Sequence, residues 1–263
     1  MHRTEKICFA NQKGGVGKTT SAVNIAACLA RSGRKVLFID SDPQGNATSG
    51  LGIKKKNIGS SVYDVLIGRV TAREATVKTS AEGLFIIPSS IDLVGAELEL
   101  VDEPNREFRL RSAIESLNGE YDYIIIDCPP SLGLLTINSL TASERVIIPM
   151  LCEYYSLEGL SQLTATISQI RRRYNPSIDL FGVLINMYDG RLNLTVAVLE
   201  EIKKYFSGKL VRTPIPRSVK ISEAPSYGMS ILEYDRNGKG AAAYSAVTRE
   251  IIDRCEKTGG NNG

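Results

Sequence analysis

Gln12-Lys13-Gly14-Gly15-Val16-Gly17-Lys18-Thr19-Thr20 is the stretch of this 263-residue chain from which most of its structure can be inferred. It follows an apolar run, residues 7–10, and precedes a helix-like stretch, residues 21–31. A strand, a glycine-rich turn and a helix in this order are the context of a phosphate-binding loop. The glycines let the backbone curl so that several N–H groups point at one anion, and the helix dipole adds to that field.

Two side chains of the loop indicate what it binds. Lys18 is expected to reach the β- and γ-phosphates of a nucleotide, and the Thr19 hydroxyl is expected to bind Mg²⁺. The residues expected around the phosphates are those of the turn and of the first helical turn: Gly14, Gly15, Val16, Gly17, Lys18, Thr19 and Thr20. A dinucleotide fold is excluded, because Gly15-Val16-Gly17 is not followed by the third glycine of a G-x-G-x-x-G motif.

The loop departs from the usual G-x-x-x-x-G-K-[ST] pattern at two positions. Gln12 stands where glycine is usual, and Lys13 adds a second ammonium group inside the loop. Two neighbouring ammonium groups repel each other unless further phosphate charge balances them, for instance charge from another subunit's nucleotide.

Apolar, β-branched runs alternate with helical patterns along the chain, and this alternation predicts an α/β fold with a doubly wound, mostly parallel sheet. The strand-like runs are residues 6–10, 35–40, 84–88, 123–127, 145–149, 180–186 and 210–215. The helix-like stretches are residues 19–31, 62–67, 106–117, 157–174, 193–206 and 245–257. Because no linker or internal repeat interrupts them, we predict one P-loop domain over residues 1–257, followed by a disordered tail over residues 258–263.

The composition restricts the class of protein. No apolar run approaches the length of about 18 residues that spans a bilayer, and the N-terminus lacks the apolar region of a signal peptide, so a cytoplasmic protein is expected. The five cysteines are widely spaced and form no C-x-x-C pair, which favours buried free thiols over a zinc or redox site. The single histidine, His2, argues against histidine-based catalysis.

Three aspartates follow predicted strands, where open parallel sheets bind their ligands. Asp127 ends the apolar run 123–126 and is expected to hold Mg²⁺, in part through water. Asp42 lies on the loop after the run 36–39, from which it could orient the attacking water; Asp40 is expected to support the metal or the loop. The segment 129–133, Pro-Pro-Ser-Leu-Gly, is expected to act as a hinge when the γ-phosphate leaves.

Together these features resemble the ParA/MinD group of ATPases with a deviant Walker A motif, and most closely the chromosomal (Soj) type of ParA. The resemblance is carried by residues 13–20, 40–52, 123–133, 152–160 and 221–226, and it extends over about residues 6 to 255. It implies an ATPase that binds ATP and Mg²⁺ and forms a homodimer around ATP. It also implies non-specific binding of double-stranded DNA, a nucleoid-associated location, and stimulation of hydrolysis by a ParB-type centromere-binding protein, in the service of chromosome or plasmid segregation.

The resemblance also assigns individual residues. It implies that Lys13 is the signature lysine, which reaches across the dimer to the partner's ATP and acts with Lys18 and Asp42 in catalysis. It places adenine against Asn186 and the segment that contains Pro214 and Pro216. An asparagine amide can pair with an adenine edge, since it offers both a donor and an acceptor.

A basic run provides the candidate nucleic-acid surface. Residues 203–220 contain six Lys or Arg side chains and no acid, whereas the whole chain has a net charge of +3. Because no base-reading motif accompanies them, sequence-independent contact with phosphates is expected. Arg191, Arg217 and Lys220 are the residues predicted to contact DNA. The cluster at residues 171–173 ends a helix pattern, where cations stabilise the helix dipole, and is interpreted as structural.

Three other functions stay open at this point. A MinD-like membrane ATPase needs a basic amphipathic C-terminal helix, but the charges of residues 245–257 sum to zero. A nitrogenase-reductase-like protein needs cysteines placed to share an iron–sulfur cluster between subunits, and no such spacing is evident. A nucleotide-bound scaffold without turnover would not need Asp42.

Overall fold

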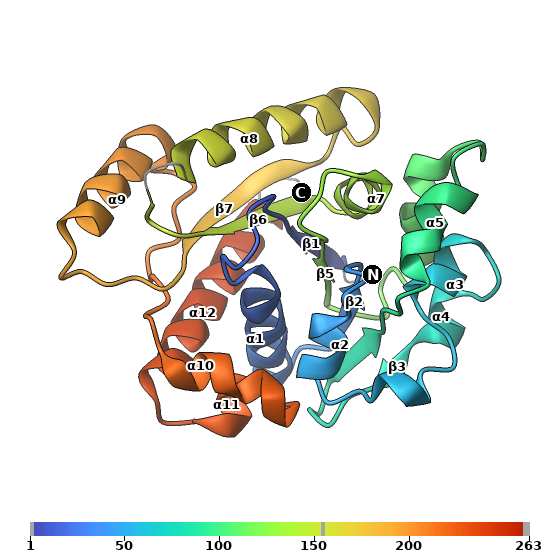
Figure 1. The fold of residues 1–263 in the computed structure, drawn as a ribbon, viewed down its shortest axis with the longest axis horizontal. Coiled ribbons are helices and arrows are strands. Elements are labelled where there is room, and N and C mark those ends of the chain that lie inside the picture. The colour runs from blue at the N-terminus through green and yellow to red at the C-terminus, as the bar shows by residue number, and fades with distance from the viewer. Residues whose placement is uncertain (1–2, 154–155, 260–263) are drawn as a thin grey trace.

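The computed structural model describes residues 3–153 and 156–259, in which seven strands form one sheet in the order β3-β4-β2-β5-β1-β6-β7 (Figure 1). All neighbouring strands pair in parallel except β3 with β4. The strands are β1 (Glu5–Phe9), β2 (Val36–Asp40), β3 (Val77–Lys78), β4 (Leu84–Ile87), β5 (Tyr123–Asp127), β6 (Arg145–Met150) and β7 (Asp179–Ile185). This confirms the predicted doubly wound, mostly parallel α/β fold in a single domain.

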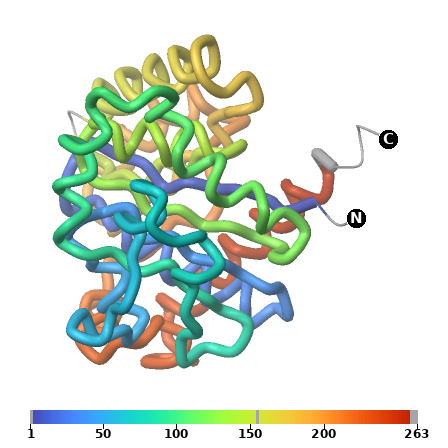
Figure 2. The backbone as a smooth tube through the Cα atoms, turned by 90° about the vertical axis from the view of Figure 1, so that its right-hand side faces the viewer, coloured from blue at the N-terminus to red at the C-terminus, as the bar shows by residue number. Residues whose placement is uncertain are grey.

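The sheet is buried on both faces, as the near-continuous apolar runs predict. Successive residues of a strand point to opposite faces, so Ile124 and Ile126 of β5 join one apolar core while Tyr123 and Ile125 join the other. Helices cover both cores, and Figure 2 shows the resulting layers, with α8 on one side of the sheet and α10 and α11 on the other.

One core is closed by the helices that follow the phosphate loop and by those near the C-terminus. These are α1 (Lys18–Arg31), α2 (Asn46–Gly50), α10 (Val219–Glu223), α11 (Ile231–Tyr234) and α12 (Lys239–Gly259). The other core is closed by α3 (Val62–Leu66), α4 (Ala72–Ala75), α5 (Leu93–Glu99), α6 (Arg109–Glu115), α7 (Leu134–Thr141), α8 (Ser156–Arg173) and α9 (Asn193–Phe206). Short 3₁₀ turns are η1 (Lys55–Asn57), η2 (Arg106–Phe108) and η3 (Ala224–Tyr227).

The position of β1 explains where a ligand can bind. β1 lies between β5 and β6, while the connection through α1 leads away to β2. The strand order therefore reverses at β1, and such a switch point opens a crevice beyond the carboxyl ends of the strands. The phosphate-loop sequence begins directly after β1 and so enters this crevice.

The predicted strand at residues 210–215 is wrong. This segment runs beside β7 and makes hydrogen bonds from Val211 N–H to Val183 O (2.9 Å) and from Ile215 N–H to Ile185 O (2.8 Å). It forms only isolated bridges, because Pro214 and Pro216 have no N–H to donate to a continuous ladder. The other six predicted strands are present, with ends that differ by one residue or none, and the short antiparallel strand β3 was not predicted.

Other predictions concern the cysteines and the chain ends. All five cysteines are buried free thiols, as predicted, and burial raises the pKa of the Cys28 and Cys152 thiols to about 11. The helix predicted at residues 245–257 is the second half of α12, which runs to Gly259. His2 and most of the predicted disordered tail lie outside the described residues, so the tail stays a prediction. None of the helices in the described part of the chain combines the length and the apolar character that a bilayer crossing requires.

Candidate functional site

The loop between β1 and α1 has the backbone of an anion cradle. Gly15 and Gly17 have φ values of +75° and +80°, a left-handed conformation that side chains disfavour. A Cβ atom at Gly17 would also lie 2.7 Å from Asn186 Nδ2. Helix α1 begins at Lys18 without a side-chain cap, so its first N–H groups remain available for an anion.

Lys18, Thr19 and Asp127 meet at the carboxyl ends of β1 and β5. Lys18 Nζ lies 2.9 Å from Asp127 Oδ1, and the Thr19 hydroxyl donates to Asp127 Oδ2 at 2.6 Å. Burial raises the pKa of the Asp127 carboxyl, and the Lys18 charge and the Thr19 hydroxyl oppose this shift only in part. Burial lowers the pKa of Lys18, but the charge and the hydrogen bond of Asp127, together with the smaller effects of Cys128 and Asp42, outweigh it, and the net direction is upward. The ammonium group is therefore held charged inside the site.

The same residues fit a magnesium ion. Mg²⁺ prefers a few oxygen ligands, phosphate oxygens and water, rather than a cage built by protein side chains alone. The Thr19 hydroxyl and the Asp127 carboxylate provide oxygen donors beside the anion cradle. Within residues 3–153 and 156–259 no cluster of three His, Cys, Asp or Glu side chains forms such a cage. A site completed by nucleotide phosphates matches this donor set.

Asp40 binds Thr48 rather than Thr19, although it is the register partner of Asp127. Its Oδ2 atom accepts hydrogen bonds from the backbone N–H (2.7 Å) and the hydroxyl (2.6 Å) of Thr48, in the middle of α2. Burial, and secondly the charge of Asp127, raises the pKa of Asp40 to about 7. In this structure Asp40 supports the loop between β2 and α2, and its predicted role at the metal stays a prediction.

We expect Asp40→Ala to destabilise the protein by about 2–4 kcal/mol, since the change leaves the buried Thr48 donors without an acceptor. Urea unfolding followed by circular dichroism measures this loss. Asp253→Ala, at an exposed position of α12, is the control and should change stability by less than about 0.5 kcal/mol. Equal stability of the two variants would contradict the structural role of Asp40.

Asp42 lies on the loop after β2 and is 5% exposed. Its Oδ1 atom accepts the N–H of Gln44 at 2.9 Å, and its backbone oxygen accepts the Ser89 hydroxyl at 2.7 Å. One carboxylate oxygen is thus used to order the loop. The charge of Asp42 contributes to the raised pKa of Lys18, so Asp42 belongs to the same electrostatic site. This placement is compatible with the predicted role of Asp42 in orienting water.

Lys13 extends from the loop into an exposed position, unlike the buried Lys18. Its ammonium group forms an ion pair with Glu153, in the segment that follows β6. The loop backbone is fixed by a residue that the sequence analysis missed: Asn11 accepts the N–H of Lys13 at 2.9 Å and donates to Pro149 O at 2.7 Å. A polar residue directly between the strand and the glycines is the signal that could have identified it.

Asn186 contacts the phosphate loop itself. Its Nδ2 atom donates to Val16 O at 2.8 Å and to Ser21 Oγ at 2.9 Å. The Ser21 hydroxyl also lies 3.3 Å from the buried Tyr244 hydroxyl, a contact that no motif in the sequence indicated. Both amide protons of Asn186 are used in these hydrogen bonds. To donate to adenine, Asn186 would have to break one of them, and its adenine contact stays a prediction.

A cavity of about 280 Å³ adjoins Asn186 and opens beside the start of α1. Its lining includes Gly17, Thr20, Asn186 and Pro216, together with apolar side chains such as Ile215. Of the two prolines predicted to contact adenine, Pro216 lines this cavity and Pro214 does not. A flat base bound here would adjoin the loop that holds its phosphates.

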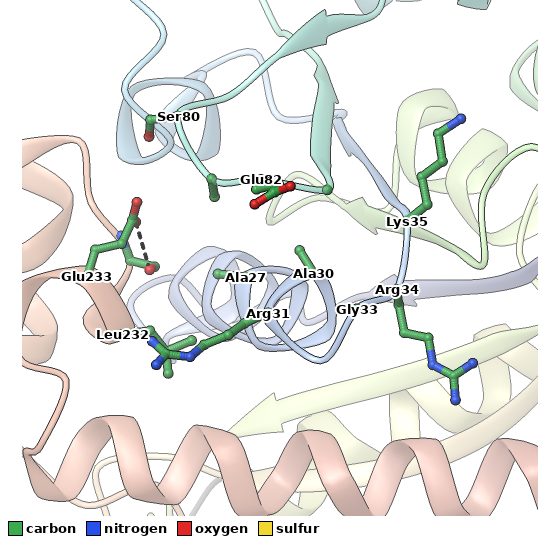
Figure 3. A pocket seen from close by; sticks show the side chains of 13 residues that line it. Ala27, Ala30, Arg31, Gly33, Arg34, Lys35, Ser80, Glu82, Leu232 and Glu233 are labelled. Carbon is green, nitrogen blue, oxygen red and sulfur yellow. Dashed lines mark hydrogen bonds between the residues drawn. The ribbon is translucent and has the colours of Figure 1, made fainter.

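A larger cavity, of about 690 Å³, lies at the opposite end of α1 (Figure 3). Arg31, Arg34, Lys35 and Glu233 are among its lining residues, and Glu233 caps α11 by accepting from Ser230 at 2.8 Å. The 14 residues of α1 rise about 1.5 Å each, which separates this cavity from the phosphate loop by roughly 20 Å. No residue predicted to bind nucleotide lines it.

Carboxylates from outside the basic run 203–220 offset part of its positive charge. Its lysines lie within 4.0 Å of carboxylates outside the run, in the pairs Lys203–Glu200, Lys204–Glu201, Lys209–Asp179 and Lys220–Asp235. Arg191 is 89% exposed and pairs with Asp189, which lowers the pKa of that carboxyl to about 2. Arg217 lies near Asp189 as well, so two of the three predicted DNA contacts share one region. Such exposed pairs are weak and can exchange a carboxylate for a phosphate.

Comparison with known proteins gives three results. A family model described as an AAA domain matches residues 4–180. The sporulation initiation inhibitor protein Soj of Bacillus subtilis is 53% identical over 93% of this chain and 97% of its own length. The chromosome partitioning protein ParA of Myxococcus xanthus is 51% identical over 94% of this chain and 88% of its own length.

Among solved structures, a cobyrinic acid a,c-diamide synthase from Mycobacterium smegmatis, with a bound ATP analogue and magnesium, superposes with a TM-score of 0.85. It is 38% identical, and the match covers 96% of each chain. The architecture described above is thus shared with a protein that binds a nucleotide and magnesium.

Proposed function

This chain belongs to the ParA/Soj family of chromosome-partitioning ATPases, and from this premise we propose that ATP switches it between a free and a DNA-bound state. ATP with Mg²⁺ occupies the cradle formed by residues 14–20. Two chains then close around the nucleotides, the closed dimer binds DNA without sequence preference, and hydrolysis reverses both steps. A ParB-type partner stimulates hydrolysis, and the DNA-bound form gathers on the nucleoid.

The observation that carries this proposal is the convergence of Lys18 and Thr19 on Asp127, next to Asp42. Lys18 is held charged where the phosphates would lie, and Thr19 and Asp127 present oxygens suited to Mg²⁺. When bound, Mg²⁺ neutralises charge that develops on the phosphate oxygens. Asp42 is placed on a loop ordered by Gln44 and Ser89, from which its carboxylate can orient a water molecule.

The exposed Lys13 supports the dimer. Its ammonium group pairs with Glu153, which is itself about half exposed, so a second chain's phosphates could replace this carboxylate. Phosphate oxygens carry more charge than one carboxylate and form strong charge-assisted hydrogen bonds. Dimerisation would also bring two weak basic surfaces onto one duplex, and two linked sites bind far more tightly than one.

The test is the anisotropy of a labelled random-sequence duplex, titrated with the protein in ATP, in ADP and without nucleotide. We expect binding with ATP alone. Arg191→Glu should weaken binding about tenfold or more at low salt and lower the slope of the salt dependence by about 1 to 2, because each dimer loses two phosphate contacts.

Arg172→Glu is the matched control, because Arg172 is also exposed but ends α8, where it was interpreted as structural. It should bind DNA like the wild type. If binding is the same in all nucleotide states, the ATP switch is wrong. If both arginine variants lose binding equally, the DNA surface is misplaced.

A further inference from the structure

A chain of hydrogen bonds links helix α12 to the phosphate loop. The Asn186 side chain, directly after β7, donates through Nδ2 to Val16 O at 2.8 Å and to Ser21 Oγ at 2.9 Å. The Ser21 hydroxyl on α1 in turn lies 3.3 Å from the Tyr244 hydroxyl on α12. Ser21, Asn186 and Tyr244 are 0%, 3% and 1% exposed, so bulk water has little access to these bonds.

The direction of the Tyr244 bond follows from burial. Among the residues that the structure describes, Ser21 is the hydrogen-bond partner of the Tyr244 hydroxyl, and it is the only one. Burial raises the pKa of this hydroxyl above its ordinary value, so the group keeps its proton. A buried proton without an acceptor is costly, and Tyr244 therefore donates to Ser21 Oγ. The Ser21 oxygen then accepts from both Tyr244 and Asn186, which uses its two lone pairs.

These contacts fix which atom of the Asn186 amide meets the loop. Besides Val16 O, Nδ2 lies 3.3 Å from Gly17 O, so the nitrogen faces two backbone oxygens. Turning the amide over would place Oδ1 against the same two oxygens, and acceptors repel one another. Since Val16 O and Ser21 Oγ take both amide protons, the side chain can offer a ligand only its Oδ1 acceptor. The one contact of Oδ1 with a described side chain is the Ser21 hydroxyl at 3.3 Å, which leaves a lone pair free.

The same side chains line the cavity in which a base would lie. Asn186 and Tyr244 both border the cavity of about 280 Å³, together with Gly17 and Thr20 from the phosphate loop and the start of α1. A nucleotide with its phosphates on the loop would therefore place its base here. An acceptor at Asn186 pairs with an exocyclic amino group, such as that of adenine, and repels a carbonyl oxygen at the same position.

We propose that Ser21 and Tyr244 are positioning residues for base recognition, which hold the Asn186 amide so that its oxygen meets the amino group of adenine. Ser21 takes the second amide proton, and Tyr244 holds the Ser21 hydroxyl where it can accept that proton. Because the first amide proton goes to Val16 O, the same side chain joins the base site to the phosphate cradle. This inference rests on the proposed binding of ATP at residues 14–20.

The test compares two nucleotides that differ only in the exocyclic amino group, ADP and purine riboside diphosphate. Calorimetry measures the binding of each to the full chain in the presence of Mg²⁺. We expect the wild type to prefer ADP about tenfold, as one hydrogen bond contributes. In Ser21→Ala and in Tyr244→Phe this preference should fall to about threefold or less. The matched control is Tyr63→Phe, which removes a hydroxyl bound to Glu99 in the other apolar core and should keep the wild-type preference.

A merely structural role would weaken both nucleotides by the same factor and leave the preference unchanged, and that result would overturn the inference. Equal binding of the two nucleotides by the wild type would overturn it as well. If the wild type binds neither nucleotide, the proposed function itself is wrong, whereas ATP-dependent retention of DNA with an unchanged preference refutes only the role of Ser21 and Tyr244. Tyr244→Phe keeps the aromatic ring in the core, so thermal melting should show a folded protein.

Discussion

Lys18→Ala is expected to lower the ATPase rate at least about 100-fold. Removing one preorganised donor from a site where charge develops typically costs about 10² to 10³ in rate. Lys18 is 7% exposed and is held by Asp127, so its ammonium group is preorganised beside the phosphate loop. The rate of phosphate release, with ATP in excess, measures the loss.

The control for this prediction is Lys78→Ala, an exposed lysine of β3 at the far edge of the sheet. It should hydrolyse ATP at the wild-type rate. The buried Asp127 loses its cationic partner in Lys18→Ala, so urea unfolding must show that the variant is folded at the assay temperature. A folded Lys18→Ala protein with more than about a tenth of the wild-type rate would contradict the assigned role.

Asp42→Ala is expected to reduce hydrolysis by about 10² to 10⁴ while leaving ATP binding intact. The side chain orders the loop through one bond to the Gln44 N–H, and the loop keeps its other anchor, the backbone oxygen of Asp42 bound by Ser89. The substitution should therefore lower the rate of the chemical step and leave the loop structure largely unchanged. Phosphate release measures the rate, and sedimentation in ATP measures the dimer.

A variant that binds ATP without hydrolysing it should accumulate as dimer and retain DNA longer than the wild type. Asp253→Ala, an exposed aspartate of α12, serves as the control and should behave like the wild type in both assays. If Asp42→Ala loses ATP binding together with hydrolysis, Asp42 orders the loop and has no separate role in catalysis.

The structure also bears on the membrane alternative that the sequence left open. The apolar residues of the C-terminal helix are buried against the core, with Val247, Ile251 and Cys255 at most 3% exposed. Since these side chains pack against the rest of the domain, they are not available to insert into a lipid surface. The packing favours the core role that the sequence suggested for this helix.

The sequence predicted the fold and the phosphate loop well, because both depend on local patterns. An apolar run such as residues 123–126 is buried on both faces of the strand only when helices cover both sides of the sheet. The glycines before Lys18 let the backbone approach a bound anion closely. The sequence analysis missed the short helices α2, α4, α5, α7, α10 and α11. It also placed a strand at residues 210–215, where the prolines interrupt the ladder.

The charges were harder to predict than the fold. Counting residues 203–220 gives six cations, but carboxylates from distant positions, such as Asp179 and Asp235, lie beside two of them. Asp40 and Asp127 each end a buried strand, and the sequence predicted a place at or near the metal for both. Only the packing of α2 shows that Asp40 binds Thr48 while Asp127 binds Lys18 and Thr19.

By itself, the sequence determined the order of six of the strands and of the longer helices, the position of the phosphate loop and the family, because these are encoded over short distances along the chain. Only the tertiary structure decided the partners of each charged side chain. Asn186 reaches the loop from 170 positions away, at Val16, and Lys220 pairs with Asp235. Such contacts depend on how the layers pack, because burial and neighbouring charges act through space and not along the sequence.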